Sequence, residues 1–451
     1  MTGQAKFTSG STMRHVVVMT LSGSLGLSFM FLVDFLALFW VSQLKDEALV
    51  AAIGFAGTIQ FFVISISIGM MIAAVALVSR ALGQGRKRRA RRIATTAMIY
   101  GVSAQVVISV IVFFFRFPLL QLSGAEGEVL EAGASFLAIS LPSLPLIAAG
   151  MMAGAILRSV GDALRSMLVT TSAGVFAMGL DPLFILYFGW GIEGAAAAIV
   201  LSRAAMAVFG FYWLLKTHDI LAKPSRPDLR LYLGAFAAIA IPGIATQIST
   251  PFGNWILVRA MAEQGDSAVA GLGVVMRLTI LSFGGIFALS GAIGGIIGQN
   301  AGAGLKDRVA RAYVDALKFC ALYTVIIWVA LGLCADLVAD LFGLSGEGAA
   351  VVRTFSYYAA GTFVFTGALF VANAAFNNLG KPFWATTVNW SRDGLLMAPL
   401  AFVLGGMMGA AGVILAQALA NSIVGIGAGI WGWRYVRSGR GIGAPRRRTA
   451  P

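Results

Sequence analysis

The chain has 451 residues, of which 59% are hydrophobic and only 12% are charged, and its mean hydropathy is +0.86. Soluble globular chains carry about 25% charged residues, so a water-soluble fold of this size could not bury so many apolar side chains. The same composition excludes a disordered or fibrous chain. An all-α polytopic membrane protein remains, because long apolar segments need a dry environment. The formal net charge of +14 is attributed to basic cytoplasmic loops rather than to nucleic-acid binding.

Twelve apolar segments are long enough to cross a bilayer. They are expected at residues 16–41, 49–79, 93–115, 132–157, 166–188, 192–215, 233–262, 267–299, 313–335, 353–376, 383–405 and 409–433. With both termini inside, 26 of the 33 basic residues fall in inner segments and 4 in outer segments. This asymmetry predicts a multi-pass protein of the plasma (bacterial inner) membrane with both termini in the cytoplasm.

The second half of the sequence repeats the first half at a constant shift of 219 in residue number. Matching positions include Gly83 and Gly302, Gly85 and Gly304, Lys87 and Lys306, Arg89 and Arg308, Arg92 and Arg311, and Gly161 and Gly380. Each half holds six spans, so both halves run the same way and are related by a pseudo-two-fold axis along the membrane normal. We expect an N-lobe at residues 1–222 (helices 1–6) and a C-lobe at 223–451 (helices 7–12). The polar stretch Thr217–Arg230 links them.

The residues that carry enzyme chemistry are scarce. There are 2 histidines and 2 cysteines, and no group of them has the spacing of metal ligands. No phosphate-binding Walker loop occurs, and no paired-carboxylate loop supports a membrane transferase. We therefore expect a protein that is not an enzyme and holds no cofactor or metal, with H⁺ or Na⁺ as the coupling ion of any transport.

Six charged residues remain in the interiors of the predicted spans, away from their ends, after the loops are assigned. They are Asp34, Asp181, Arg203, Arg277, Arg392 and Asp393. Charges at this depth are costly and normally face a cavity or a partner. Asp34 and Asp181 lie about equally far from the outer ends of two N-lobe spans, so we predict that they share a proton or cation. A structural ion pair of Asp34, for example with Arg203, is the alternative.

Two prolines mark sites where a helix loses a hydrogen bond. Pro182 leaves the carbonyl of Met178 without a helical partner, which indicates either a simple kink or an ion ligand. In the C-lobe, Pro251 is expected to break span 7 between Gln247 and Asn254. Arg203, Met178, Gln247 and Asn254 are therefore candidate cavity residues for substrate. For Gln247 and Asn254, which are neutral, the alternative role is hydrogen bonding between helices.

The second lobe lacks the acid of the first, because the repeat places Gly253 opposite Asp34. Arg277, Arg392 and Asp393 are candidates for structural ion pairs. Adjacent residues on a helix point apart, so we expect Arg392 and Asp393 to have different partners. An Arg277–Asp393 pair is the simplest hypothesis.

Four segments resemble the multidrug and toxic compound extrusion (MATE) transporters, over nearly the whole chain. They are Ala76-Leu77-Val78-Ser79-Arg80-Ala81-Leu82-Gly83-Gln84-Gly85, Leu157-Arg158-Ser159-Val160-Gly161-Asp162, Asp181-Pro182-Leu183-Phe184 and Gly191-Ile192-Glu193-Gly194-Ala195-Ala196. The resemblance implies two six-helix lobes that rock, and antiport of amphipathic, often cationic compounds against H⁺ or Na⁺. It also implies a monomer in the lipid bilayer that binds no nucleic acid.

Within that family the chain is similar to the DinF-like branch, which carries its acids in the N-lobe. Asp34 and Asp181 stand at the positions of the branch's two acids, in spans 1 and 5. Ala177 replaces an asparagine that is frequent in the branch, and Ile199 replaces a threonine. These two differences affect the expected ion coupling, and above all the expectation of a sodium site. A lipid-linked oligosaccharide flippase of the same superfamily is the alternative function, although the balance of three acids and three arginines in the spans does not favour a diphosphate ligand.

Overall fold

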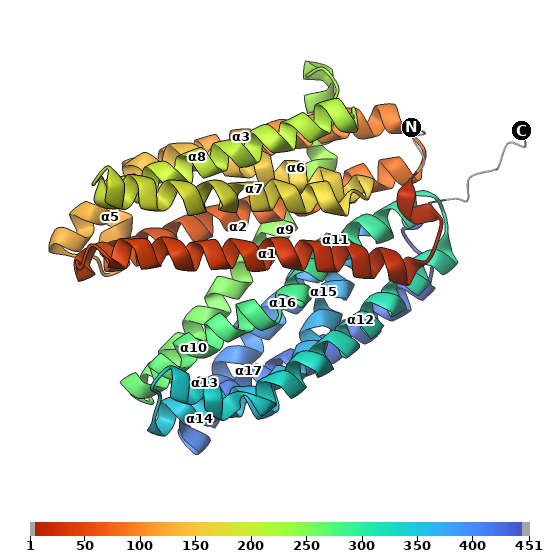
Figure 1. Cartoon of the computed structure of the whole chain (residues 1–451). Coiled ribbons are helices and arrows are strands. Elements are labelled where there is room, and N and C mark those ends of the chain that lie inside the picture. Colours follow the sequence, from red (N-terminus) through yellow and green to blue (C-terminus); the bar gives the residue numbers. More distant parts are fainter. Residues whose placement is uncertain (1–4, 444–451) are drawn as a thin grey trace, which may run out of the picture. The chain divides into compact units, whose positions relative to one another are not determined.

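A computed structural model describes residues 5–443 of the chain, except for the side chains of Asp34 and Glu47. Nearly all of these described residues are helical, and no strand occurs among them. In chain order the α-helices, labelled as in Figure 1, are α1 (Thr12–Ser42), α2 (Glu47–Gly83), α3 (Lys87–Phe114), α4 (Arg116–Leu122), α5 (Gly127–Ser140), α6 (Leu144–Val160), α7 (Ala163–Pro182), α8 (Gly191–Tyr212), α9 (Arg226–Ala262), α10 (Asp266–Ser282), α11 (Gly284–Gly302), α12 (Lys306–Leu333), α13 (Ala335–Leu341), α14 (Gly346–Thr354), α15 (Phe363–Asn378), α16 (Pro382–Trp390) and α17 (Met397–Arg437).

Each predicted span falls on a long apolar helical segment. Within the described part, 10 helices are long and apolar enough to cross a membrane, and the bent pair α10–α11 brings the number to 11. The 56-residue segment Pro382–Arg437 covers two predicted spans, because Gly409 interrupts it with a non-helical backbone (φ 64°, ψ −149°). The chain is an all-α polytopic membrane protein, as the composition predicted.

The chain divides into two compact units that do not follow the predicted lobe boundary. One unit comprises Met1–Ser24, Ser79–Arg86 and Ile241–Pro451, and the other comprises Leu25–Val78 and Lys87–Ala240. The division therefore falls inside α9 rather than at residue 222/223. Hydrogen bonds explain why the start of the chain groups with the C-terminal half. The backbone N–H of Phe7 donates to Gln299 Oε1 (2.9 Å), and Asn300 Nδ2 donates to the carbonyl of Phe7 (3.1 Å).

The turns between helices recur at the shift of 219 seen in the sequence. Helices α3 and α12 begin and end at positions related by this shift, and so do α4 and α13. Glycines with left-handed backbone (positive φ) also recur in pairs at this shift: Gly85 and Gly304, Gly124 and Gly343, Gly127 and Gly346, and Gly161 and Gly380. Glycine adopts positive φ without the steric cost that a Cβ brings. The repeat in the sequence therefore includes the conformations of the turns that end the helices.

One pair of repeat-related segments differs in shape. Helix α2 is continuous, whereas its counterpart is bent by 46° between α10 and α11 at Phe283. The hydroxyl of Tyr323 spans the break, since it donates to the carbonyl of Ser282 (2.8 Å) and accepts from the N–H of Gly285 (3.3 Å). Phe283 stacks on Phe363 with ring centroids 4.0 Å apart. The expected single span 267–299 is thus two helices, whose free backbone groups a tyrosine satisfies.

The end of α2 crosses α11 at small residues, within one unit. A Cβ added to Gly83 would lie 2.0 Å from the carbonyl oxygen of Gln299, and one added to Gly302 would lie 2.2 Å from that of Arg80. Gly302 is the repeat partner of Gly83, and Gln299 is the repeat partner of Arg80, because each pair differs by 219 in residue number. The two contacts are therefore copies of each other. Small residues four apart allow the backbones of membrane helices to approach closely, and Gly298 opposite Ser79 completes this pattern.

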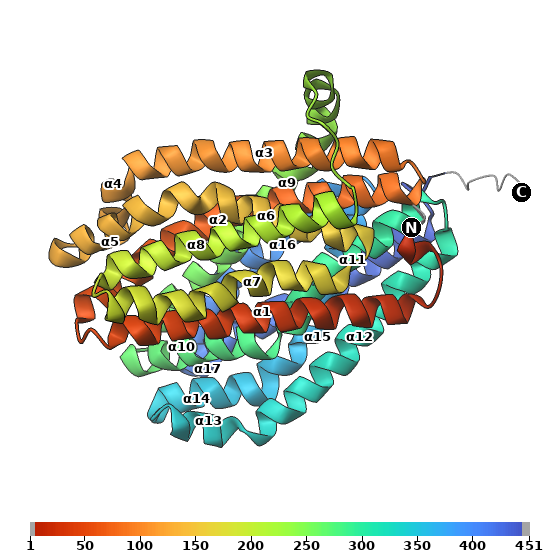
Figure 2. The same ribbon diagram turned by 45° about the horizontal axis from the view of Figure 1, so that its top comes forward.

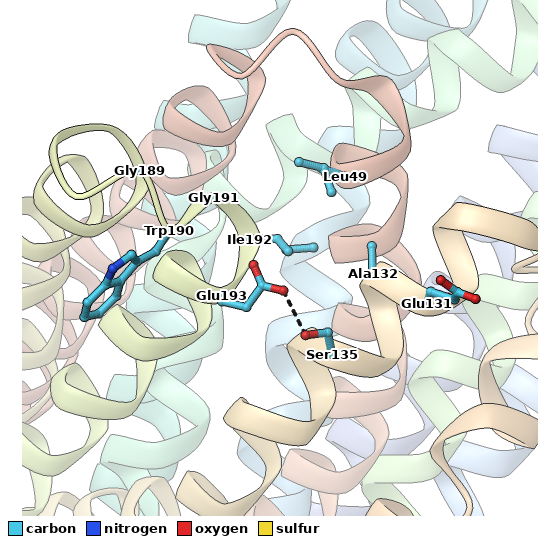
Figure 3. A pocket seen from close by; sticks show the side chains of 9 residues that line it. All are labelled: Leu49, Glu131, Ala132, Ser135, Gly189, Trp190, Gly191, Ile192 and Glu193. Carbon is cyan, nitrogen blue, oxygen red and sulfur yellow. Dashed lines mark hydrogen bonds between the residues drawn. The ribbon is translucent and has the colours of Figure 1, made fainter.

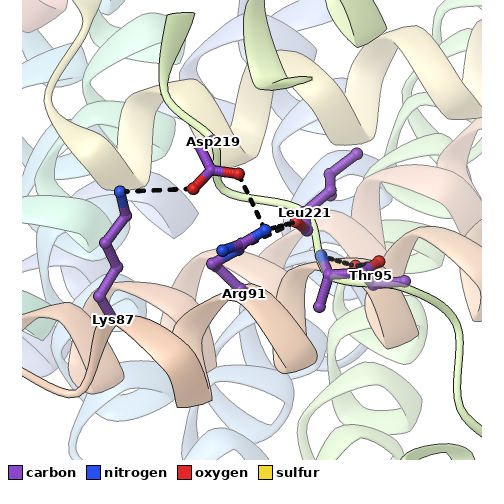
Figure 4. Close-up of polar contacts among 6 residues, drawn as sticks. Lys87, Arg91, Thr95, Asp219 and Leu221 are labelled. Atoms are coloured by element: carbon purple, nitrogen blue, oxygen red, sulfur yellow. Dashed lines mark hydrogen bonds and ion pairs between the residues drawn. The ribbon is translucent and has the colours of Figure 1, made fainter. Parts of the chain in front are cut away.

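The predicted linker is held against α3 (Figure 4). Arg91 forms an ion pair with Asp219 (2.8 Å) and donates from Nε and Nη2 to the carbonyl of Leu221. The hydroxyl of Thr95 and the backbone of Ala222 bond each other in both directions. Arg91, one of the basic residues that were attributed from the sequence to cytoplasmic loops, therefore anchors the segment between the two repeats.

Candidate functional site

Helices α1 and α7 run side by side and in the same direction (Figures 1 and 2). Gly26 of α1 faces Met167 of α7, and Phe29 and Val33 pack on Gly174. Asp34 follows Val33 directly in α1, but its side chain lies outside the described part of the structure. Its backbone is therefore next to α7, close to the level of Gly174. This arrangement brings the helix that carries Asp34 against the helix that carries Asp181.

Asp181 is buried near the end of α7, with 2% of its surface exposed. It lies two helical turns beyond Gly174, which is about 10 Å along an α-helix. Pro182 ends the α-helix, and a π-helix follows at Leu183–Tyr187. Membrane helices tolerate irregular backbone where protein surrounds it, and π-helical turns are frequent at functional sites. The proline therefore marks a change of helix type beside a buried acid.

Arg203 on α8 is the centre of a buried polar network that joins three other segments. It donates to the carbonyl of Ser140 (3.1 Å), to Ser143 Oγ (2.8 Å) and to Gln60 Oε1 (2.5 Å). Gln60 in turn donates to Ser140 Oγ (2.8 Å). Arg203 is 8% exposed, so it lies between helices of its own unit. A substrate that contacted it would need to displace several of these hydrogen bonds.

The other cavity candidates lie on more accessible surface. Met178 is 40% exposed on α7. On α9, Gln247 is half-buried and Asn254 is exposed, and neither side chain forms a hydrogen bond to another described residue. The expected break at Pro251 is wrong, because α9 continues through it to Ala262. Pro251 lacks a backbone N–H, and in membrane helices hydroxyl side chains can satisfy the backbone carbonyl that is left without this donor.

The predicted Arg277–Asp393 pair is also wrong. Arg392 forms the ion pair instead, with its Nε 2.7 Å from Asp393 Oδ1 and its Nη2 2.8 Å from Oδ2. The prediction relied on the directions of adjacent side chains in a regular α-helix. Residues Ser391–Leu396 form a π-helix, and the long arginine side chain bends back to its neighbour. Arg277 is exposed and forms no ion pair with a described residue.

The carboxylate of Asp393 lies where the repeat places the missing acid. A Cβ added to Gly253 would lie 3.0 Å from Asp393 Oδ1, so the carboxylate packs on this glycine. Ser249, one turn earlier on α9, donates to Asp393 Oδ2 (2.9 Å). Gly253 is the repeat partner of Asp34. The C-terminal half therefore does hold a buried acid beside this position, but the acid comes from span 11 rather than span 7.

A depression of about 580 Å³ lies where α8 begins (Figure 3). Its lining comes from α2, α5, the turn before α8 and the first residues of α8, and consists of Leu49, Glu131, Ala132, Ser135, Gly189, Trp190, Gly191, Ile192 and Glu193. Ser135 Oγ donates to Glu193 Oε1 (3.0 Å). The predicted topology places this acidic depression on the outer side. It contains one of the segments that resemble the MATE transporters.

Asp162 organises the turn between α6 and α7. Gly161 ends α6 with a left-handed backbone (φ 91°), and Asp162 caps α7 by accepting from the N–H of Arg165 (3.1 Å). Its carboxylate also bonds His218 Nε2 (2.8 Å) and Arg165 Nη1 (2.5 Å). Burial raises the pKa of Asp162, but the hydrogen bonds outweigh it and hold the pKa below its usual value. This turn is one of the segments on which the resemblance rests.

These features together define a class of protein. Long apolar helices, repeated halves and buried charges at membrane depth are those of a polytopic membrane transporter. The MatE family model matches residues 24–183 and again residues 242–403. The starting points of the two matches, residues 24 and 242, agree closely with the shift of 219 in the sequence. The chain belongs to the MatE family, whose members are transporters and not enzymes.

Curated relatives span most of the chain. The chain is 28% identical to a FAD transporter of Shewanella oneidensis over 402 residues, which are 86% of this chain and 87% of that protein. It is 22% identical to the multidrug export protein MepA of Staphylococcus aureus, with 87% of each chain covered. Both relatives are named as transport proteins, and the matches cover most of each of them.

Solved structures share the fold. The crystal structure of a point mutant of the Vibrio cholerae MATE transporter VcmN matches with a TM-score of 0.91. It is 22% identical, and the match covers 96% of this chain and 98% of the other. An outward-facing multidrug resistance MATE transporter of the MOP superfamily matches with a TM-score of 0.89 and the same coverage. The predicted MATE-like fold is confirmed.

Proposed function

We propose that the chain is an antiporter that exports amphipathic, often cationic organic compounds against H⁺ or Na⁺. Asp34 and Asp181 serve as its ion-coupling carboxylates. The observation that carries the proposal is the buried Asp181 beside the change from α- to π-helix, on the helix that packs along α1. A carboxylate in such surroundings changes its charge when the coupling ion binds. Loss of that charge alters its electrostatic interactions and shifts the protein between two states.

The transport cycle that we propose uses rocking of the two repeat-related lobes against each other, between inward and outward openings. Gln247, Asn254 and Met178 are the candidate substrate contacts, because they offer polar or adaptable surface, and Arg203 is a further candidate at the helix interface. The protein acts as a monomer in the bacterial inner membrane, with cytoplasmic termini. The strong excess of basic residues in the inner segments supports this orientation.

The decisive experiment measures efflux of a cationic dye from vesicles that contain the purified protein, under an imposed pH or sodium gradient. We expect Asp34→Asn and Asp181→Asn to abolish gradient-driven efflux while the proteins insert at the wild-type level. Glu131→Gln, which changes an acid of the outer depression, is the matched control and should export normally. Full export from vesicles that contain the Asp34→Asn protein would refute the proposal. Comparing the two gradients identifies the coupling ion.

A second candidate substrate comes from the comparison with the FAD transporter, at 28% identity over most of both chains. Export of a flavin dinucleotide would need sites that accept an aromatic ring and negative phosphates. Efflux of FAD from the same vesicles, followed by flavin fluorescence, tests this candidate directly. FAD retained at the rate of protein-free vesicles would exclude it.

A further inference from the structure

The Arg392–Asp393 pair is held by contacts from the residues just before the π-helix and from within it. The indole of Trp390 donates to the carbonyl of Ala245 on α9 (2.9 Å). The hydroxyl of Thr386 on α16 donates to the carbonyl of Pro242 (2.9 Å). Asp393 receives its third hydrogen bond from Ser249, which is fully buried. The backbone around the pair is therefore fixed to α9, and the pair is not a chance surface contact.

Packing alone does not account for a charged pair at this position. Arg392 is 6% exposed and Asp393 is 3% exposed. A well-packed apolar pair of similar volume is often as stable as a buried ion pair, because the two charges must lose their water. Ionisable groups inside membrane spans usually mark the path of a substrate or ion. The pair therefore calls for a functional reason.

Arg392 has donors that Asp393 does not use. A guanidinium carries five N–H donors, and two of its nitrogens are bonded to Asp393. Nη1 forms no hydrogen bond to another described residue, and it is not one of the fully buried atoms without a partner. Nη1 is therefore not fully buried, and its N–H groups have no partner among the described residues. The planar guanidinium suits a carboxylate or phosphate group better than an ammonium does.

Aromatic side chains pack between the two segments that carry the pair and its Ser249 contact. Trp390 precedes the π-helix and contacts Phe252 with ring centroids 5.4 Å apart, and Phe252 contacts Trp255 at 6.0 Å. Phe252 is 37% exposed and Trp255 is 57% exposed. Accessible aromatic faces beside a charged group suit a flat amphipathic molecule that carries one charged end.

We propose that Arg392 is an anion site of the transporter and binds the carboxylate or phosphate of an aromatic substrate. Asp393 is its resident counter-ion. Without a ligand, Asp393 neutralises Arg392. When the ligand binds, it shares or replaces these hydrogen bonds, while Ser249 continues to hold Asp393. The proposal rests on the transport function above and extends the substrate class from cations to molecules with an anionic end.

The test compares riboflavin 5′-phosphate with riboflavin, two fluorescent probes that share a ring system and differ by one phosphate. Their binding to the purified, detergent-solubilised full chain is measured by fluorescence anisotropy. We expect wild type to bind the phosphate form about tenfold more tightly. The double variant Arg392→Gln/Asp393→Asn replaces both charges by neutral groups of similar shape. It should lose this preference and keep the affinity for riboflavin.

The single variant Asp393→Asn separates the proposal from a structural role. It removes the counter-ion and frees Arg392, so the phosphate form should bind more tightly than to wild type, by about tenfold. A purely structural pair predicts either no change or a parallel loss for both probes, and either result overturns the proposal. Equal affinity of wild type for the two probes, or binding of neither, also refutes it.

A lipid headgroup could supply the same phosphate chemistry. Phosphatidylglycerol added to the micelles should leave the difference between the two probes in place. If the lipid abolishes that difference, the site belongs to a headgroup and the substrate assignment falls. Binding in detergent involves no ion gradient, so its result is independent of whether Asp34→Asn fails in the export assay.

Discussion

The crossing of α2 and α11 leads to a prediction about stability. In Gly302→Ala the new methyl carbon would lie 2.2 Å from the carbonyl oxygen of Arg80, whereas ordinary contacts begin at 3.4 Å. The two backbones must part by about 1.2 Å, because neither carbonyl nor helix can rotate away. Overpacking of this kind costs about 1–3 kcal/mol. Gly302 ends its helix, so the gain in helix propensity does not offset this loss.

The measurement is equilibrium unfolding by SDS in mixed micelles, which gives the free energy of unfolding. Gly54→Ala is the matched control, because it lies inside α2 and a Cβ there meets nothing within 4 Å. It should be neutral or stabilising by up to about 1 kcal/mol, as alanine replaces glycine in a helix. If Gly302→Ala unfolds like Gly54→Ala, the helices do not cross at this residue.

The symmetry of the crossing adds a second requirement. Gly83→Ala faces the carbonyl of Gln299 at 2.0 Å, so it should cost about as much as Gly302→Ala. Once one substitution has separated the helices, the second meets less resistance. The double variant should therefore lose clearly less than the two single losses added together. Strict additivity would mean that the two contacts are independent.

Two further predictions concern the termini of helices. Asp162→Asn should destabilise the protein by about 1 kcal/mol at pH 7, because it removes charged hydrogen bonds to Arg165 and His218. The pKa of Asp162 is depressed in the folded protein, so its charge stabilises the fold at pH values above the ordinary pKa of 3.8. In SDS-unfolding titrations, the difference in free energy of unfolding between Asp162→Asn and wild type should therefore narrow as the pH falls below 3.8. A difference that stays constant with pH would argue against a role of the charge. Arg308→Ala should release residues 5–10, since Arg308 donates to carbonyls of that segment. In a Cys334→Ser background, maleimide labelling of Phe7→Cys, at a position that is 1% exposed, should then accelerate by about tenfold, and Arg311→Ala should leave it unchanged.

Hydrophobic length and repeat spacing predicted the helices well. A membrane span must satisfy its own backbone, so about twenty apolar residues already determine a helix. The turns were predictable for a related reason, because Gly161 and Gly380 are needed where the backbone becomes left-handed. The bend at Phe283 was not predictable. It depends on the hydroxyl of Tyr323, which belongs to the next helix and whose side chain satisfies the broken backbone.

Some charged residues of the structure were predicted correctly from the sequence and others were not. The outcome depends on whether the charge lies inside an apolar span or close to the membrane surface. Asp181 was identified as a buried charge, since an acid within an apolar span is too costly to keep without a partner or a function. The docking of the linker by Arg91 was not identified, because basic residues near a membrane are usually attributed to topology. A charge that orients a protein and a charge that holds two segments together look the same in the sequence.

The C-terminal acid shows why a repeat alone can mislead. Comparison of the halves at a shift of 219 gives Gly253 opposite Asp34 and suggests that the charge has been lost. In the structure that glycine leaves room for Asp393, whose carboxylate comes from another helix. Two halves of a repeat can thus place similar chemistry at related positions while drawing it from different spans. Substitution of Gly253 by a larger residue would therefore act on the Arg392–Asp393 pair, although the two segments are far apart in the sequence.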